Sequence, residues 1–186
     1  YGREEPAVNG RGAFVRLLES LHDIDGLERL RFTSPHPIGF REDLVNAYTY
    51  LPKLCSHIHF PMQSGSDRIL QLMRRPYKNE KYLRLCDAMR EARPDLAITT
   101  DIIVGFPGET DEEFEDTVKL CEKVRNDAMF TFIYSRRPGT LADSLPDQIP
   151  EAVKHRRSEY LIEQCAAEKD PSGQGQLWQR NGKETL

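Results

Sequence analysis

An acidic residue lies inside the most apolar stretch of this sequence. Asp101 is flanked by Thr99 and Thr100 on one side and by Ile102 and Ile103 on the other. Because burying an isolated charge is costly, this carboxylate must be paired or hydrogen-bonded. It either faces a ligand or forms a structural ion pair, and the sequence leaves both interpretations open.

Two nearby histidines and the cysteines are the first candidates for metal ligands. His57 and His59 share one face of an expected strand, but no carboxylate or third histidine accompanies them at a useful spacing. We therefore favour interior histidines with hydrogen-bond partners over a metal site. The four cysteines, at positions 55, 86, 121 and 165, show no paired ligand spacing. Cys86 and Cys121 fall among apolar residues at helical spacing, which predicts core positions.

The segment GFPGET at 105–110 combines glycines with the expected start of a helix. Thr110 and Glu113 have the spacing of a capping box, and the acidic residues after Thr110 suit the positive end of a helix dipole. Those acids would repel a polyphosphate, and the segment has neither the GxGxxG order of dehydrogenases nor a P-loop. It fits a nucleoside or a cationic ligand against the backbone, or a tight turn that needs glycine for geometry alone.

Other polar groups follow the expected strands. Gln63, Ser64 and Ser66 form a run of neutral hydrogen-bonding side chains suited to a ribose or an amino-acid group. A helix N-cap explains Ser66 equally well and leaves Gln63 unexplained. The basic pairs at 74–75 and 136–137 are more typical of a solvated face than of an RNA contact.

Strand-like and helix-like segments alternate along the chain. Strands are expected at 30–33, 55–60, 97–104 and 129–134, and helices at 12–22, 41–50, 67–74, 80–92, 111–125 and 150–168. This order predicts right-handed βαβ crossovers and a parallel sheet, as in doubly wound folds and (β/α) barrels. All four polar turns follow strands, so they meet at the carboxyl edge of the sheet, where α/β folds bind ligands.

Length and composition favour one globular domain. The chain has 186 residues, a hydrophobic fraction of 38% and a net charge of −4, so bulk charge does not indicate a nucleic-acid binder. No stretch approaches the roughly 18 apolar residues of a spanning helix, and we expect no membrane association and no export signal. Unpaired cysteines suit a reducing cytoplasm. Four βα units are fewer than a complete barrel, so we expect a longer protein, with 1–168 as the C-terminal part of its barrel and 169–186 as a disordered polar tail.

Four motifs together carry a resemblance to a known family. They are RFTSPHP at 31–37, HFPMQSGSD at 59–67, DIIVGFPGET at 101–110 and YSRRPGT at 134–140. In this order and spacing they resemble the radical SAM methylthiotransferases of the MiaB type, the tRNA 2-methylthioadenosine synthases. The resemblance covers about residues 1–169. The QSGSD and SPHP turns favour the tRNA branch over the RimO-type branch, which acts on a ribosomal protein.

The resemblance implies a fold and a chemistry. The fold would be an α/β, partial radical SAM (β/α) barrel of about four parallel βα units. In that family a CxxxCxxC loop holds a [4Fe–4S] cluster, and reductive cleavage of S-adenosylmethionine gives a 5′-deoxyadenosyl radical. An auxiliary cluster supplies sulfur and a second S-adenosylmethionine supplies the methyl group. The product is a 2-methylthio group on N6-prenylated adenosine beside the anticodon, so the implied partners are a tRNA anticodon loop and a reductant such as flavodoxin or ferredoxin.

The strand-end motifs would line the S-adenosylmethionine site of such an enzyme. The resemblance implies that Gln63 and Ser64 contact the ribose or the methionyl group. It also implies that Gly105, Phe106 and Pro107 offer backbone and a ring to the adenine. No residue of this chain is assigned as the catalytic group.

The resemblance assigns four further residues to the same site. Ser34 and His36 would lie near the mouth of the barrel lumen, and Asp101 inside it. Arg137, rather than Arg136, occupies the arginine position of its motif and would meet the carboxylate of S-adenosylmethionine or RNA.

The sequence also departs from the family pattern. It contains no CxxxCxxC, and its four cysteines cannot replace that motif. We therefore expect no metal ligands in this chain and no catalysis by this chain alone. The alternatives are a ribosomal-protein methylthiotransferase of the same family, and a truncated, non-catalytic remnant that binds S-adenosylmethionine, RNA or a partner chain.

Overall fold

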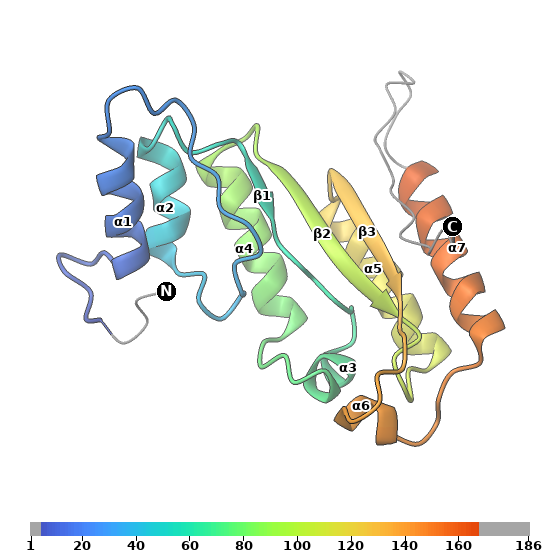
Figure 1. Cartoon of the computed structure of the whole chain (residues 1–186). Helices are drawn as coiled ribbons and strands as arrows, with labels where there is room; N and C mark the ends of the chain where they lie inside the picture. Colours follow the sequence, from blue (N-terminus) through green and yellow to red (C-terminus); the bar gives the residue numbers. More distant parts are fainter. Residues whose placement is uncertain (1–4, 168–186) are drawn as a thin grey trace.

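The computed structural model describes residues 5–167, in which helices and strands alternate (Figure 1). The segment expected to be a disordered tail, 169–186, lies outside the described residues. The strands are β1 (His57–His59), β2 (Ala97–Val104) and β3 (Ala128–Ile133). The helices are α1 (Ala13–His22), α2 (Glu42–Tyr50), α3 (Asp67–Leu72), α4 (Asn79–Ala92), α5 (Asp111–Val124), α6 (Leu141–Ser144) and α7 (Glu151–Ala167). The short helix α6 was not expected from the sequence.

The three strands form one parallel sheet in the order β1-β2-β3. The register pairs His59 with Thr99 and Asp101 with Phe130. Parallel neighbours joined through helices are the βαβ arrangement that the sequence predicts, and this expectation is confirmed.

The expected first strand, 30–33, is not a regular strand. It makes only two isolated parallel bridges among the described residues, from Leu30 to Leu54 and from Thr33 to His59. Between these bridges the first segment advances by three residues and its partner by five. This difference shifts the register by two residues, so a continuous ladder cannot form. The segment nevertheless runs parallel to the chain that leads into β1 and ends beside β1 at His59.

Buried and half-buried residues alternate along β2, because helices cover one face of the sheet. Ile98, Thr100, Ile102 and Val104 are fully buried. Helix α4 packs against α5, and α7 packs against α5, β2 and β3, so these helices form the layer behind the sheet (Figure 1). The alternate residues of β2, among them Asp101, are half-buried on the opposite face.

Several local expectations are confirmed. Thr110 and Glu113 form a complete capping box at the start of α5. The hydroxyl of Ser66 accepts a hydrogen bond from the Ile69 amide and caps α3. Cys86 and Cys121 are buried in the core. Over residues 5–167, no helix is long and apolar enough to cross a membrane.

Candidate functional site

A cavity of about 720 Å³ opens at the carboxyl end of the sheet. Its lining includes four of the nine residues that sequence analysis assigned to the site, Gln63, Asp101, Phe106 and Arg137. They follow or lie in three different strands, and helices α3 and α6 lie at the same end of the sheet (Figure 1). The cavity falls within the size range of small-molecule sites. The parallel sheet thus brings together side chains that are up to 74 residues apart in sequence, counted from Gln63 to Arg137.

Asp101 is both paired and directed at the cavity. Its Oδ2 lies 3.2 Å from Nε2 of His59, and Nδ1 of the same ring lies 3.0 Å from the Thr99 hydroxyl. In one tautomer of His59, Nε2–H donates to the carboxylate and Nδ1 accepts from the Thr99 hydroxyl. Asp101 therefore has the polar partner that one interpretation requires, and it also lines a cavity, while its contact with a ligand stays a prediction.

The second histidine of the pair has a partner for one ring nitrogen, whereas its Nδ1 is buried without a hydrogen-bond partner among the described residues. Nε2 of His57 lies 3.2 Å from the Thr99 hydroxyl. Burial, followed by the charges of Arg31 and His59, lowers the pKa of His57 below its usual value. The expectation of interior histidines with partners is confirmed for both ring nitrogens of His59 and for Nε2 of His57. Within the described part of the chain, no group of three or more His, Cys, Asp or Glu side chains could hold a metal ion.

Gln63 has an unusual backbone that extends the sheet toward the cavity. Its φ of 69° lies in the left-handed region, which a non-glycine residue adopts at a cost in energy. Its amide donates to the Asp101 carbonyl at 2.8 Å, and its carbonyl accepts from the Ile103 amide at 2.9 Å. Its side-chain amide makes no hydrogen bond with any residue in 5–167. A polar group is thus held at the cavity wall with its hydrogen-bonding capacity unused.

The turn after β2 is shaped by glycine and closed by a carboxylate. Gly105 has a φ of 72°, and its amide donates to Oε2 of Glu109 at 2.8 Å. Phe106 packs edge-on against the ring of Tyr134, with 5.2 Å between the ring centroids, and both rings line the cavity. Pro107 is buried and lies outside the cavity lining.

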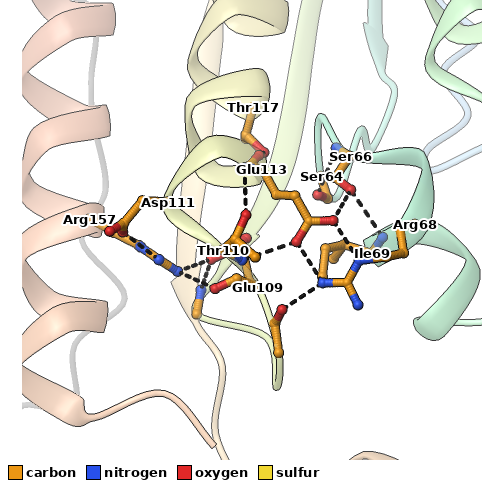
Figure 2. A network of polar contacts seen from close by, with 12 residues as sticks. Ser64, Ser66, Arg68, Ile69, Glu109, Thr110, Asp111, Glu113, Thr117 and Arg157 are labelled. Carbon is orange, nitrogen blue, oxygen red and sulfur yellow. Dashed lines mark hydrogen bonds and ion pairs between the residues drawn. The ribbon is translucent and has the colours of Figure 1, made fainter. Parts of the chain in front are cut away.

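The turn that follows β1 is tied to helix α5. The Gly65 amide donates to the Thr117 hydroxyl at 2.8 Å, and the Ser66 hydroxyl donates to Oε1 of Glu113 at 2.8 Å. Arg68 donates to both oxygens of Glu113, as Figure 2 shows. The hydrogen bond from Arg68 is the largest cause that lowers the pKa of Glu113 to about 2. The two strand-end turns are therefore held by one polar network.

Helix α7 supplies two buried cations that the sequence analysis missed. Arg157 forms ion pairs with Glu109 and Asp111, both at 2.7 Å (Figure 2). Lys154 donates to the Tyr134 carbonyl at 3.1 Å. Burial raises the pKa of Glu109, whereas the Gly105 amide and the Arg157 guanidinium oppose that rise. The signal in the sequence that could have indicated a cation was Glu109, because a carboxylate in the buried GFPGET turn needs a positively charged or hydrogen-bonding partner.

The remaining residues assigned from the sequence lie outside the cavity lining. Ser34 has a φ of 50° and donates its amide to the His59 carbonyl. Nδ1 of His36 accepts from the Ile38 amide, and its ring lies edge-on to Tyr77. Ser64 is fully buried and its hydroxyl accepts from the Ser66 amide. Their roles in ligand binding stay predictions.

Arginines form part of the cavity rim. Arg74, Arg75 and Arg137 line the cavity and make no ion pair with any residue that the structure describes. Arg136, in contrast, pairs with Asp143 at 2.8 Å and is absent from the lining. The arginine chosen from its motif position is thus the one of the pair that reaches the cavity.

Comparison with known proteins places the chain in a family. The profile of the Radical SAM superfamily matches residues 5–121, and the chain belongs to this superfamily. It is 62% identical over 162 residues to the tRNA-2-methylthio-N(6)-dimethylallyladenosine synthase of Akkermansia muciniphila, covering 87% of this chain and 35% of that protein. It is 54% identical over 164 residues to the enzyme of the same name from Opitutus terrae, covering 88% and 34%. The chain thus spans about a third of these relatives.

Two solved structures share the fold. Coproporphyrinogen III oxidase (HemN) from Escherichia coli, described as a radical SAM enzyme, superposes with a TM-score of 0.59 at 19% identity, covering 83% of this chain and 35% of that one. SuiB from Streptococcus suis superposes with a TM-score of 0.52 at 12% identity, covering 84% and 34%. These likenesses confirm the partial radical SAM barrel that the strand-end motifs imply.

Proposed function

We propose that residues 1–168 form the C-terminal part of the radical SAM barrel of a tRNA methylthiotransferase. The reaction would add a 2-methylthio group to N6-prenylated adenosine beside the anticodon. The names of the relatives at 54% to 62% identity support this tRNA reading over a ribosomal-protein substrate. The observation that carries the proposal is the convergence of Gln63, Asp101, Phe106 and Arg137 on one cavity in a radical SAM fold.

The cavity fits S-adenosylmethionine by size and by chemistry. The rings of Phe106 and Tyr134 offer an apolar surface for the adenine, and the free amide of Gln63 suits a ribose hydroxyl. Asp101 offers a negative charge to the ammonium or sulfonium, and Arg137 offers a positive charge to the carboxylate.

The other assigned residues have supporting roles in this proposal. Gly105 and Pro107 would shape the backbone that faces the adenine, Ser64 would fix the conformation of the Gln63 turn, and Ser34 and His36 would border the mouth. When bound, S-adenosylmethionine supplies an organic radical after reductive cleavage and, from a second molecule, a methyl group. The protein's part is to orient it and to exclude water from the cavity.

The iron–sulfur clusters of the family do not fit the residues of this chain. The sequence has no CxxxCxxC. Within residues 5–167, no cluster of His, Cys, Asp or Glu could hold a metal ion. The cluster ligands would have to come from outside these 186 residues, and the reductant, a flavodoxin or ferredoxin, would act there.

The rim arginines suit an RNA substrate. Arg74 and Arg75 flank the cavity with guanidinium groups that have no carboxylate partner among residues 5–167. One carboxylate of S-adenosylmethionine needs at most one of the three arginines, so the others are free to bind backbone phosphates of an anticodon loop. A tRNA substrate implies a cytoplasmic location.

The test uses the natural gene product, meaning the whole polypeptide encoded by the gene that carries this sequence. After anaerobic reconstitution it is incubated with S-adenosylmethionine, a reductant and tRNA, and the nucleosides are analysed by mass spectrometry for 2-methylthio adenosine. Asp101→Asn keeps the shape but removes the charge, so we expect weaker S-adenosylmethionine binding. Asp116→Asn, on the exposed face of α5, is the matched control. Failure of the unaltered protein to bind S-adenosylmethionine would refute the proposal.

A further inference from the structure

Two cations of helix α7 are buried against the loops that border the cavity. Lys154 is 2% exposed and Arg157 is 5% exposed. They are three residues apart and therefore lie on the same face of the helix. Buried lysines and arginines are rare unless they are paired, so their partners indicate what they hold in place.

Arg157 is connected to the turn that carries Phe106 by a chain of short contacts. Its Nη1 donates to Oε2 of Glu109 at 2.7 Å and to the Glu109 carbonyl at 3.2 Å. The same Oε2 accepts from the amide of Gly105, the residue before Phe106. Its Nη2 donates to Asp111 on the opposite side (Figure 2). The guanidinium group thus contacts the C-terminal end of the turn directly and its N-terminal end, at Gly105, through the Glu109 carboxylate.

Lys154 holds the neighbouring side of the cavity. Its Nζ forms an ion pair with Glu151 of the same helix at 2.7 Å, donates to the Tyr134 carbonyl at 3.1 Å and lies 5.4 Å from the centre of the Tyr134 ring. Its aliphatic part lies so close to Gly105 that a Cβ atom at that position would collide with it. One face of α7 therefore fixes both residues of the Phe106–Tyr134 pair that lines the cavity.

The turn needs such support because its backbone is intrinsically adaptable. Gly105 and Gly108 both have left-handed backbones, with φ values of 72° and 78°. Glycine loses more conformational freedom on ordering than any other residue. A tether that orders the turn in advance removes that cost from ligand binding.

We propose that Arg157 is a positioning residue for S-adenosylmethionine, which ties the Phe106 turn to α7 so that the cavity is preformed for the adenosyl group. This inference rests on the proposed function. It adds a residue, Arg157, that affects the affinity for S-adenosylmethionine without contacting it. Because the guanidinium acts through Glu109, its loss weakens ground-state and transition-state binding alike. It therefore raises KM for S-adenosylmethionine and leaves kcat nearly unchanged.

The test compares three forms of the natural gene product with the unaltered protein. Arg157→Met removes the tether, and Glu109→Gln with Arg157→Met removes both charges, so that no uncompensated carboxylate is left buried. Arg156→Gln changes an exposed neighbour on α7 and is the matched control. The dissociation constant of S-adenosylmethionine is measured by calorimetry, and hydrogen exchange is followed in the peptide that covers 105–110.

We expect Arg157→Met to weaken binding about tenfold or more, the equivalent of losing a charged hydrogen bond, and to accelerate exchange in the turn. The double variant should regain thermal stability, because replacing a buried ion pair by neutral residues is often tolerated, but should still bind weakly. Recovery of both stability and affinity in the double variant would reduce Arg157 to a structural role and overturn the inference. So would binding by Arg157→Met within twofold of the unaltered protein.

Two further outcomes are distinguishable. If neither methionine variant folds, Arg157→Lys keeps the charge but loses the two-sided grip; binding at least threefold weaker supports the inference, and unchanged binding overturns it. If the unaltered protein binds no S-adenosylmethionine, the proposed function itself fails.

Discussion

Gly65 is expected to be the least replaceable residue of the turn after β1. A Cβ atom built at this position would lie well inside 3.0 Å of the backbone of Asp116 and Thr117 on α5, whereas ordinary contacts begin at 3.4 Å. In Gly65→Ala the turn and the helix must therefore separate. The separation opens the 2.8 Å hydrogen bonds from the Gly65 amide to Thr117 and from the Ser66 hydroxyl to Glu113.

The size of the effect follows from these contacts. Overpacking costs about 1 to 3 kcal/mol, and each of the two lost hydrogen bonds adds about 1 kcal/mol, so the free energy of unfolding should fall by about 3 to 5 kcal/mol. Urea denaturation of the natural gene product, followed by circular dichroism, would show the midpoint falling by about 1.5 to 2.5 M. Gly39→Ala is the control, because its added Cβ would lie 3.6 Å from the nearest atom, the His36 carbonyl oxygen. Equal stability of Gly65→Ala and the unaltered protein, within about 0.5 kcal/mol, would refute the packing of this turn on α5.

Three other expectations concern charge and reactivity. If Arg74 and Arg75 bind phosphates, replacing either by Gln should reduce the salt dependence of tRNA binding by about 0.7 in log–log slope; an unchanged slope in filter binding excludes that arginine. Arg68 depresses the pKa of Glu113 from 4.5 to about 2, so the stability that this carboxylate contributes is present above about pH 4.5 and is lost as the pH falls toward 2. Acid unfolding of Glu113→Gln, which keeps the capping box, should accordingly depend less on pH in that window. Burial raises the pKa of Cys86 to about 12, so maleimide followed by peptide mapping should label it only on unfolding, more slowly than the half-buried Cys55.

Local features were predicted well because short-range physics determines them. The capping box of Thr110 and Glu113 and the N-cap of Ser66 depend on hydrogen bonds across three residues, and both occur as expected. The burial of Cys86 and Cys121 follows from helical periodicity. The segment at 30–33 looked like a strand by composition, but its pairing depends on the register of its partner, which local sequence does not specify.

In the candidate site, too, local features could be predicted from the sequence, whereas contacts between distant segments could not. Asp101 could be recognised in the sequence because a charge in an apolar strand requires a partner, but the partner itself, His59, depends on the register between β1 and β2. Ser64 and Gln63 are adjacent and similar in chemistry. Only the left-handed backbone at Gln63 directs one side chain to the cavity and leaves the other buried in the turn.

The alternation of strands and helices, the edge of the sheet where polar turns gather, and the family could all be predicted from the amino-acid sequence. These features depend on periodicity and on motifs that are contiguous in the chain. Which of the nine assigned residues share a cavity depends on tertiary packing, and so does the contact of Lys154 and Arg157 of α7 with the turn after β2. The carboxylate of Glu109 and the guanidinium of Arg157, which form a buried ion pair, are 48 residues apart in the sequence. A contact across such a separation forms only when the packing of a helix on a sheet brings the two segments together, and no local pattern of residues encodes that packing.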